Sequence, residues 1–251
     1  MMGAIARPPA LAMIPWAHLE VQAMDDSVRT FAAQHFALAG GVAHDSLPGL
    51  LLSSLAPIAL LAAAGASAAL IANVPEQQRG GVVRCSGVLF GVHTLLLLPL
   101  VELGIKPAVH RLRPDVLHHH SFSFPSGHTT SATYVSGALL FVLLPRLVDA
   151  LAAARPNSPR LVLPPRPALV GLWLATSLGT ALGRVLADAH WFTDTVAGAL
   201  LGAVLLGASL PLLEPGELAD AHASASEADL QGQASTAASS DGKENHVSGP
   251  F

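Results

Sequence analysis

The chain has 251 residues, of which 51% are hydrophobic and only 12% are charged, whereas an average soluble domain carries about 25% charged residues. This composition argues against a soluble globular protein and indicates an integral membrane protein. The formal net charge of −4 gives no electrostatic support for nucleic-acid binding, and the single cysteine, Cys85, excludes an intramolecular disulfide.

The first predicted element is a short helix at residues 28–42. It contains Arg29, Gln34 and His35, and it is short for a segment that must cross a bilayer. We predict that this helix lies at the membrane interface, and a sixth crossing is the alternative. It belongs to an N-terminal segment that we assign to residues 1–48.

Five later stretches are long and apolar enough to cross roughly 30 Å of hydrocarbon. They are residues 50–71, 83–103, 130–151, 167–182 and 191–213, of which the fourth is the shortest. The sequence therefore predicts an all-α fold, a polytopic transmembrane helical bundle within residues 49–213. The acidic tail at residues 214–251 is rich in Ala and Ser, and we expect it to be disordered.

Three polar clusters stand at the ends of these spans. They are Lys106 with Arg113 and Pro114; Pro125, Ser126, Gly127 and His128; and Arg184 with His190 and Asp194. Each crossing moves the chain to the other face of the membrane, so counting the spans places all three clusters at the same face. The sequence therefore predicts a single site that the three clusters share.

The positive residues are distributed unequally between the two faces. Six arginines flank the loops on the face opposite the clusters: Arg79, Arg84, Arg146, Arg155, Arg160 and Arg166. Because positively charged loops stay on the cytoplasmic side, the clusters are predicted to face away from the cytoplasm.

The first two clusters contain groups that suit a phosphate. Ser126 can cap the helix that follows, Gly127 permits close backbone approach, and free amides at a helix start bind anions. Arg113 adds a fork of donors, and Lys106 adds a mobile charge. The alternatives are an ordinary turn before a helix and basic residues that anchor span ends at the interface.

The third cluster pairs an imidazole with a carboxylate. His190 and Asp194 are four residues apart, so they lie on one face at the start of the fifth span. Asp194 can accept a hydrogen bond from one ring nitrogen and leave the other as a nucleophile, while His128 offers a second imidazole to carry a proton. The alternative is a structural helix cap.

The ordered set K-x6-R-P, P-S-G-H and R-x5-H-x3-D resembles the type 2 phosphatidic acid phosphatase (PAP2) superfamily, which also includes vanadium haloperoxidases and bacterial acid phosphatases. The resemblance covers residues 106–202 and includes the run TDTVAG near its end. It implies a metal-independent phosphatase with a helical-bundle core. The integral-membrane members of this family dephosphorylate lipid phosphates or polyprenyl diphosphates.

The resemblance also implies a role for each matching residue. His190 would form a phosphohistidine, Asp194 would orient it, and His128 would act as the acid and then as the base. The phosphoryl oxygens would be held by Lys106, Arg113, Ser126, Gly127 and Arg184. Two positions depart from expectation: Gly183 stands where the family usually has Ser, and Asp188 adds a carboxylate close to His190, where it would weaken phosphate binding or raise imidazole basicity.

We predict no metal and no cofactor. Three histidines, His118, His119 and His120, follow one another before the second cluster, but consecutive positions do not converge on one ion as spaced ligands do.

The prediction is therefore a membrane phosphatase that acts on a lipid phosphate monoester or a polyprenyl diphosphate, with the bilayer and this lipid as its partners. Two alternatives remain at this point. One is a non-catalytic lipid-binding membrane protein with a relic site, for which Gly183 is the support. The other is a vanadate-dependent haloperoxidase, which the spans disfavour.

Overall fold

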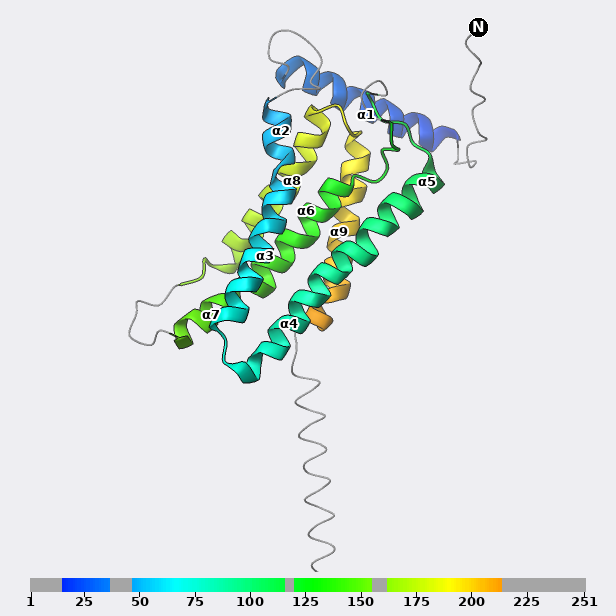
Figure 1. Cartoon of the computed structure of the whole chain (residues 1–251). Helices are drawn as coiled ribbons and strands as arrows, with labels where there is room; N and C mark the ends of the chain where they lie inside the picture. Colours follow the sequence, from blue (N-terminus) through cyan, green and yellow to red (C-terminus); the bar gives the residue numbers. More distant parts are fainter. Residues whose placement is uncertain (1–14, 37–46, 116–119, 155–161, 214–251) are drawn as a thin grey trace, which may run out of the picture. The chain divides into compact units, whose positions relative to one another are not determined.

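A computed structural model describes residues 15–36, 47–115, 120–154 and 162–213. This part of the chain is helical and contains no strand (Figure 1). The predicted disordered tail at residues 214–251, most of the run His118 to His120 and the first 14 residues lie outside the described residues.

Five helical stretches of the described chain are long and apolar enough to cross a membrane, which confirms the five predicted spans. They are Pro48–Asn73, Arg79–Val109, Gly127–Ala154, Arg166–Leu186 and Phe192–Leu212. Each of the first four extends beyond the predicted bounds, because helical hydrogen bonding continues past the purely apolar core of the segment.

The spans are built from shorter helical elements. The first span contains α2 (Leu47–Ser53) and α3 (Leu55–Asn73). The second contains α4 (Glu76–Gly91), the π-helical stretches η2 (Val92–Leu97) and η3 (Leu100–Ile105), and α5 (Lys106–Val109). The third contains α6 (Gly127–Ala138), the π-helical η4 (Leu139–Leu143) and α7 (Leu144–Ala154). The last two are α8 (Arg166–Leu186) and α9 (Phe192–Leu213).

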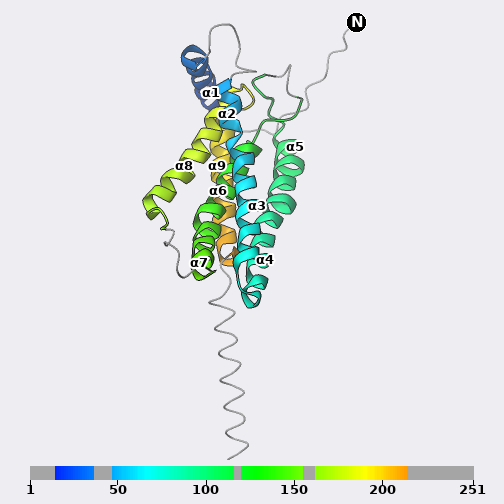
Figure 2. The ribbon, with the colours of Figure 1, turned by 60° about the vertical axis from the view of Figure 1, so that its left-hand side comes forward.

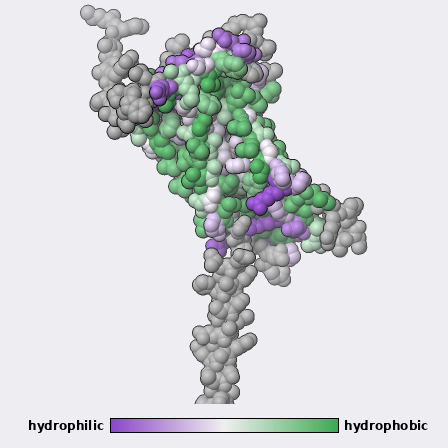
Figure 3. All heavy atoms as spheres, turned by 180° about the vertical axis from the view of Figure 1, so that it is seen from behind, coloured by the Kyte–Doolittle hydropathy of each residue, from purple (hydrophilic) through white to green (hydrophobic). Residues whose placement is uncertain are grey.

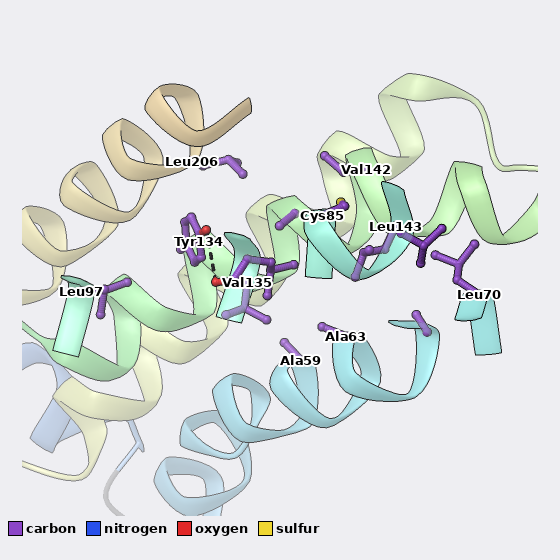
Figure 4. Packing of buried hydrophobic residues seen from close by; sticks show 14 of the residues in the cluster. Ala59, Ala63, Leu70, Cys85, Leu97, Tyr134, Val135, Val142, Leu143 and Leu206 are labelled. Carbon is purple, nitrogen blue, oxygen red and sulfur yellow. Dashed lines mark hydrogen bonds between the residues drawn. The ribbon is translucent and has the colours of Figure 1, made fainter. Parts of the chain in front are cut away.

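Helix α6 lies at the centre of the bundle, against α3, α8 and α9 (Figures 1 and 2). Tyr134 of α6 is fully buried in the apolar core, and its hydroxyl donates to the Leu89 carbonyl over 3.4 Å (Figure 4). Small residues let α9 approach closely: a Cβ on Gly202 would lie 2.6 Å from the Thr130 carbonyl oxygen. Close packing thus fixes α9 against the start of α6.

The outer surface of the bundle is apolar. Leu61, Leu95 and Leu103 are 72%, 81% and 77% exposed. Apolar residues cover the middle of the bundle, and polar residues gather toward its ends (Figure 3). A soluble monomer rarely exposes so large an apolar surface, which supports an integral membrane protein.

Helix α1 (Pro15–Phe36) lies across one end of the bundle and packs on α8 and α9 (Figure 1). The predicted start at residue 28 was wrong, because the helix begins 13 residues earlier, and the predicted end at residue 42 lies outside the described residues. Pro at the first helical position has no amide to lose and has a preset φ, so Pro15 begins the helix rather than breaking it. The apolar length needed for a span is absent from α1, so the described residues do not support the alternative of a sixth crossing.

Candidate active site

The three polar clusters meet at the end of the bundle that α1 covers (Figures 1 and 2). Lys106 begins α5 and His128 is the second residue of α6. Arg184 stands in the last turn of α8, and Asp194 stands in the first turn of α9. The spans therefore bring together residues that are up to 88 positions apart, as the count of crossings predicts.

Arg113 and His190 join the first cluster to the third. The Arg113 Nη1 atom lies 3.4 Å from Nε2 of His190 and donates to the Ala189 carbonyl over 3.0 Å. The same guanidinium donates to the Ser121 hydroxyl over 2.9 Å and to the Ser121 carbonyl over 3.1 Å. These contacts hold a buried cation directly against the imidazole.

The orientation of His190 separates its two ring nitrogens. Nε2 faces a guanidinium that has only donors, so Nε2 is the nitrogen with the free electron pair and Nδ1 carries the proton. Nδ1 lies 3.6 Å from Oδ2 of Asp194, slightly beyond hydrogen-bonding distance. His190 thus presents a nucleophilic nitrogen to the cations and its N–H to a carboxylate.

His190 is only 2% exposed, and this burial is the main reason that its pKa falls to about 3. The nearby charges of Arg113 and Arg184 lower the pKa further, while Asp194 opposes the shift. The imidazole is therefore neutral near pH 7, which is the form that can attack phosphorus.

Ser126 confirms the predicted helix cap and ties the second cluster to the third. Its hydroxyl accepts from the Thr129 amide over 3.5 Å and from the Thr129 hydroxyl over 3.1 Å. Its own amide donates to the Asp194 carbonyl over 2.9 Å. The start of α6 and the start of α9 are thus fixed to each other by a main-chain hydrogen bond.

Glu102 is a carboxylate at the site that the sequence analysis missed. Lys106 Nζ donates to its Oε1 over 2.6 Å, and that oxygen would lie 3.2 Å from a Cβ added to Gly127. The first and second clusters are therefore adjacent. A side chain at position 127 would approach this carboxylate closely, while the predicted approach of a ligand to the Gly127 backbone stays a prediction.

Arg184 and His128 are the remaining predicted site residues. Nε of Arg184 is buried and has no hydrogen-bond partner among the described residues, so it is available to an anion. The His128 side chain is exposed at the start of α6, and the charges of Arg184, Arg113 and Lys106 all act on its imidazole. The predicted site residues thus lie together in the structure.

The glycine at position 183 is explained by packing. A Cβ there would lie 2.6 Å from the Ser53 amide nitrogen and 2.7 Å from Cβ of Leu52. Helix α2 therefore lies so close to α8 that no side chain fits between them. The absence of a side chain at Gly183 therefore has a packing reason.

The carboxylate of Asp188 is paired with α1. Arg29 donates to both of its oxygens, over 2.7 Å from Nε and 2.6 Å from Nη2. The pKa of Arg29 is raised chiefly by this hydrogen bond. The negative charge expected to disturb His190 is therefore compensated by a cation from the N-terminal helix.

The sequence analysis also missed a second contact between α1 and the site residues. Asp25 of α1 is buried and pairs with Arg111, which in turn donates to Oδ1 of Asp194 over 2.7 Å. Asp25 also accepts from the amide and the hydroxyl of Thr193. The i, i+4 spacing of Asp25 and Arg29 is a sequence signal for one charged face of a helix.

Within the described residues, no group of three or more His, Cys, Asp and Glu side chains is arranged to hold a metal ion. His118 and His119 lie outside the described residues, so the structure bears on the predicted absence of a metal only for the remainder of the chain.

Comparisons with known proteins agree with this geometry. No curated protein sequence matches the chain significantly. Among solved structures, the chain is similar to a transmembrane PAP2-type phosphatidylglycerolphosphate phosphatase from Bacillus subtilis, with 19% identity and a TM-score of 0.52 over 75% of this chain and 83% of that one. At this identity the likeness concerns the fold.

The model of the PAP2 superfamily matches residues 87–214, which is slightly more than half of the chain and includes all three clusters. The chain therefore belongs to the PAP2 superfamily.

Proposed function

We propose that this protein is a membrane phosphatase that hydrolyses a lipid phosphate monoester or a polyprenyl diphosphate through a phosphohistidine on His190. The observation that carries the proposal is the contact between Arg113 and His190, which sets a neutral, buried imidazole against a cation at 3.4 Å. Family membership and the transmembrane fold support the same activity.

The proposed reaction has two steps. Nε2 of His190 attacks the terminal phosphorus, the bond from phosphorus to the leaving oxygen breaks, and His128 protonates that oxygen. The leaving oxygen is the alcohol oxygen of a monoester or the bridging oxygen of a diphosphate. His128 then takes a proton from a water molecule, which attacks phosphorus, breaks the bond to nitrogen and releases inorganic phosphate. Lys106, Arg113 and Arg184 stabilise the charge on the phosphoryl oxygens, so no metal ion is required.

The position of the site at the end of apolar spans supports a lipid substrate. A lipid tail that lies along the bundle contributes about 0.8 kcal/mol per buried methylene, so a water-soluble phosphate is expected to be a poorer substrate. The similar Bacillus subtilis protein is named as a phosphatidylglycerolphosphate phosphatase, which supports a phosphorylated lipid headgroup as the target.

The site is proposed to face away from the cytoplasm. Arg79, Arg84, Arg146 and Arg166 belong to α4, α7 and the start of α8. The first part of α4 and helix α7 lie at the end of the bundle opposite α1 (Figure 1). At the site end, Arg29 and Arg111 are paired with aspartates of the fold and so contribute little net positive charge. This asymmetry supports the orientation by the positive-inside rule.

The test is phosphate release by purified protein from a panel of lipid phosphates and polyprenyl diphosphates, with EDTA present throughout. Wild-type protein is expected to release phosphate without added metal. His190→Ala and His128→Ala are expected to lower turnover by at least about 10³-fold, as the loss of a nucleophile or its proton carrier does elsewhere.

His120→Ala is the matched control, because this residue is exposed in the loop before α6 and is not one of the proposed site residues. It is expected to keep wild-type turnover. Near-normal turnover in both His190→Ala and His128→Ala, with the proteins folded, would refute the proposed mechanism, and a requirement for added metal would refute metal independence.

A further inference from the structure

We propose that α1, which precedes the part of the chain matched by the family model, is a working part of the active site: Asp25 acts through Arg111 to position Asp194, and thereby His190. The proposal rests on the proposed function, because it assigns a positioning role in that reaction. It concerns a carboxylate that lies 165 residues before the nucleophile in the sequence.

Asp25 is only 1% exposed and makes three contacts with groups near the site. One of its oxygens accepts from the Thr193 amide over 2.9 Å, and the other accepts from the Thr193 hydroxyl over 2.7 Å. The second oxygen also pairs with the Arg111 guanidinium. A single carboxylate thus binds the first turn of α9 and a cation at the same time.

Arg111 transmits this contact to the proposed catalytic pair. Its Nη1 atom donates to the Thr193 hydroxyl over 2.6 Å and to Oδ1 of Asp194 over 2.7 Å. The other oxygen of Asp194 lies 3.6 Å from Nδ1 of His190 and accepts from the Trp191 amide over 3.0 Å. The Asp194 carboxylate therefore has its plane set by Arg111 on one side and faces His190 on the other.

Arg29, a second residue of α1, binds the beginning of the segment at residues 188–193, whose end is bound by Asp25. Arg29 lies one helical turn after Asp25 and binds both carboxylate oxygens of Asp188, two residues before His190. Asp188 adopts a left-handed conformation with φ of 51°, which an ordinary residue rarely adopts. The Trp191 ring lies 5.9 Å from the Arg29 guanidinium and 5.5 Å from that of Arg111. Residues 188–193 are thus held at both ends by one face of α1.

Attachment of α1 to the bundle does not by itself require these charges. Burying a carboxylate and a guanidinium costs several kcal/mol of solvation that their attraction only partly returns, whereas apolar contacts would hold a surface helix at lower cost. The described apolar contacts of α1 with the bundle include Ala32 against Val185 and Leu186. The buried pair instead specifies one geometry at Asp194, which is what a positioning role demands.

The charge balance around Arg111 has a direct effect on the reaction. This one cation is shared between the carboxylates of Asp25 and Asp194. If Asp25 loses its charge, the full attraction of Arg111 acts on Asp194, which then stabilises less well the positive charge that develops on His190 during attack. Binding of the phosphoryl group by Lys106, Arg113 and Arg184 is not directly affected.

The test compares Asp25→Asn with Asp26→Asn in the full-length protein, assayed in detergent with the lipid phosphate that the wild type hydrolyses best. Asp26 is the matched control, because it is the neighbouring carboxylate on α1 and is exposed, with a contact to Gln22. Asp25→Asn is expected to lower kcat by about 10- to 100-fold, as the loss of outer partners of functional groups does at metal sites. Its KM is expected to change less than threefold, and Asp26→Asn is expected to match the wild type.

Arg111→Gln provides a second, specific readout. Because Asp25 is proposed to act through Arg111, the double variant Asp25→Asn with Arg111→Gln should lose no more kcat than Arg111→Gln alone. Additive losses in kcat, or a rise in KM with kcat unchanged, would overturn the positioning role. Rates are normalised to folded protein, so that a variant with normal kcat per folded molecule also overturns it.

A readout that does not depend on turnover separates this proposal from the proposed function. His190 is buried, so wild-type protein should resist carbethoxylation by diethyl pyrocarbonate at this residue, as followed by mass spectrometry. Asp25→Asn is expected to raise that rate about tenfold by loosening the loop, and Asp26→Asn to leave it unchanged. A wild type that releases no phosphate refutes the proposed function, whereas equal modification rates in the two variants refute the role of Asp25.

Discussion

The surroundings of His190 keep its imidazole neutral. Burial and two arginines disfavour a proton on this imidazole, and only Asp194 favours one. A phosphoryl group bound between Arg113 and Arg184 would offset their positive charge. Binding of the proposed substrate would therefore raise the basicity of His190, the proposed nucleophile, and so couple recognition to reactivity.

This residue also predicts how stability depends on pH. The folded protein protonates His190 only near pH 3, whereas the unfolded chain takes up that proton near pH 6.5. Between these values the unfolded state binds more protons, so stability falls as the pH decreases from about 6.5 toward 3. His190→Gln removes this contribution, so the loss of Tm between pH 7 and pH 4.5 should be smaller in the variant than in the wild type.

Thermal unfolding in detergent at the two pH values measures the difference. The exposed imidazole of His35, replaced in the same way, controls for the removal of a histidine. Equal pH dependence in wild type and His190→Gln would show that the buried imidazole is not neutral in the folded protein.

At the scale of elements, helix α8 offers a matched pair of glycines. A Cβ on Gly183 would meet the main chain of α2 at 2.6 Å and 2.9 Å, whereas a Cβ on Gly171 would have no atom within 4 Å. Gly183→Ala is therefore expected to cost about 1–3 kcal/mol, because main-chain atoms cannot move aside as a flexible side chain can. It should also lower turnover, since the adjacent Arg184 would be displaced.

Gly171→Ala in the same helix is expected to stay within about 0.5 kcal/mol of the wild type. The Tm of both variants in detergent and their phosphate release give the comparison. A Gly183→Ala protein as stable as Gly171→Ala would contradict the close approach of α2 and α8.

The elements differ in how far the sequence could predict them. The spans were found because lipid requires long apolar stretches with internal hydrogen bonding, and this demand is visible in composition alone. Helix α1 begins at Pro15 and not at the predicted residue 28, because a search for apolar stretches passes over a helix that carries buried charge. Asp25 is paired with Arg111 from a distant part of the chain, which local sequence does not reveal.

At the scale of the whole molecule, the sidedness of the bundle can be tested by labelling. The single native cysteine is buried, so unmodified protein should not react with a membrane-impermeant maleimide. His120→Cys lies in an exposed position at the site end, and Glu76→Cys lies in an exposed position at the opposite end. In sealed right-side-out vesicles, only His120→Cys should be labelled from outside.

Both variants should react equally once the vesicles are opened with detergent, which controls for intrinsic reactivity. Labelling of Glu76→Cys alone in sealed vesicles would reverse the orientation inferred from the arginines. The enzymatic proposal would stand in that case, since the chemistry does not depend on which compartment the site faces.

The sequence could predict that the three clusters lie at the same end of the bundle, but it could not predict the ion pairs that form around them. Counting crossings places Arg113, His128 and His190 at the same end, because each span reverses the direction of the chain. The counting cannot show that Arg29 neutralises Asp188 or that Glu102 pairs with Lys106, because these depend on how side chains pack at that end. The proposed reactive residues could be recognised from the sequence pattern, whereas the residues that pair with their neighbours are revealed only by the structure.

Within the described residues, α1 forms ion pairs that join Arg29 to Asp188 and Asp25 to Arg111, across 159 and 86 positions. During synthesis Arg111 follows the second span, whereas Asp188 follows only the fourth. A nascent chain that stops before α9 contains His190 but lacks Thr193 and Asp194. The contacts of α1 with the segment at residues 188–193 can therefore be completed only after most of the bundle has been synthesised.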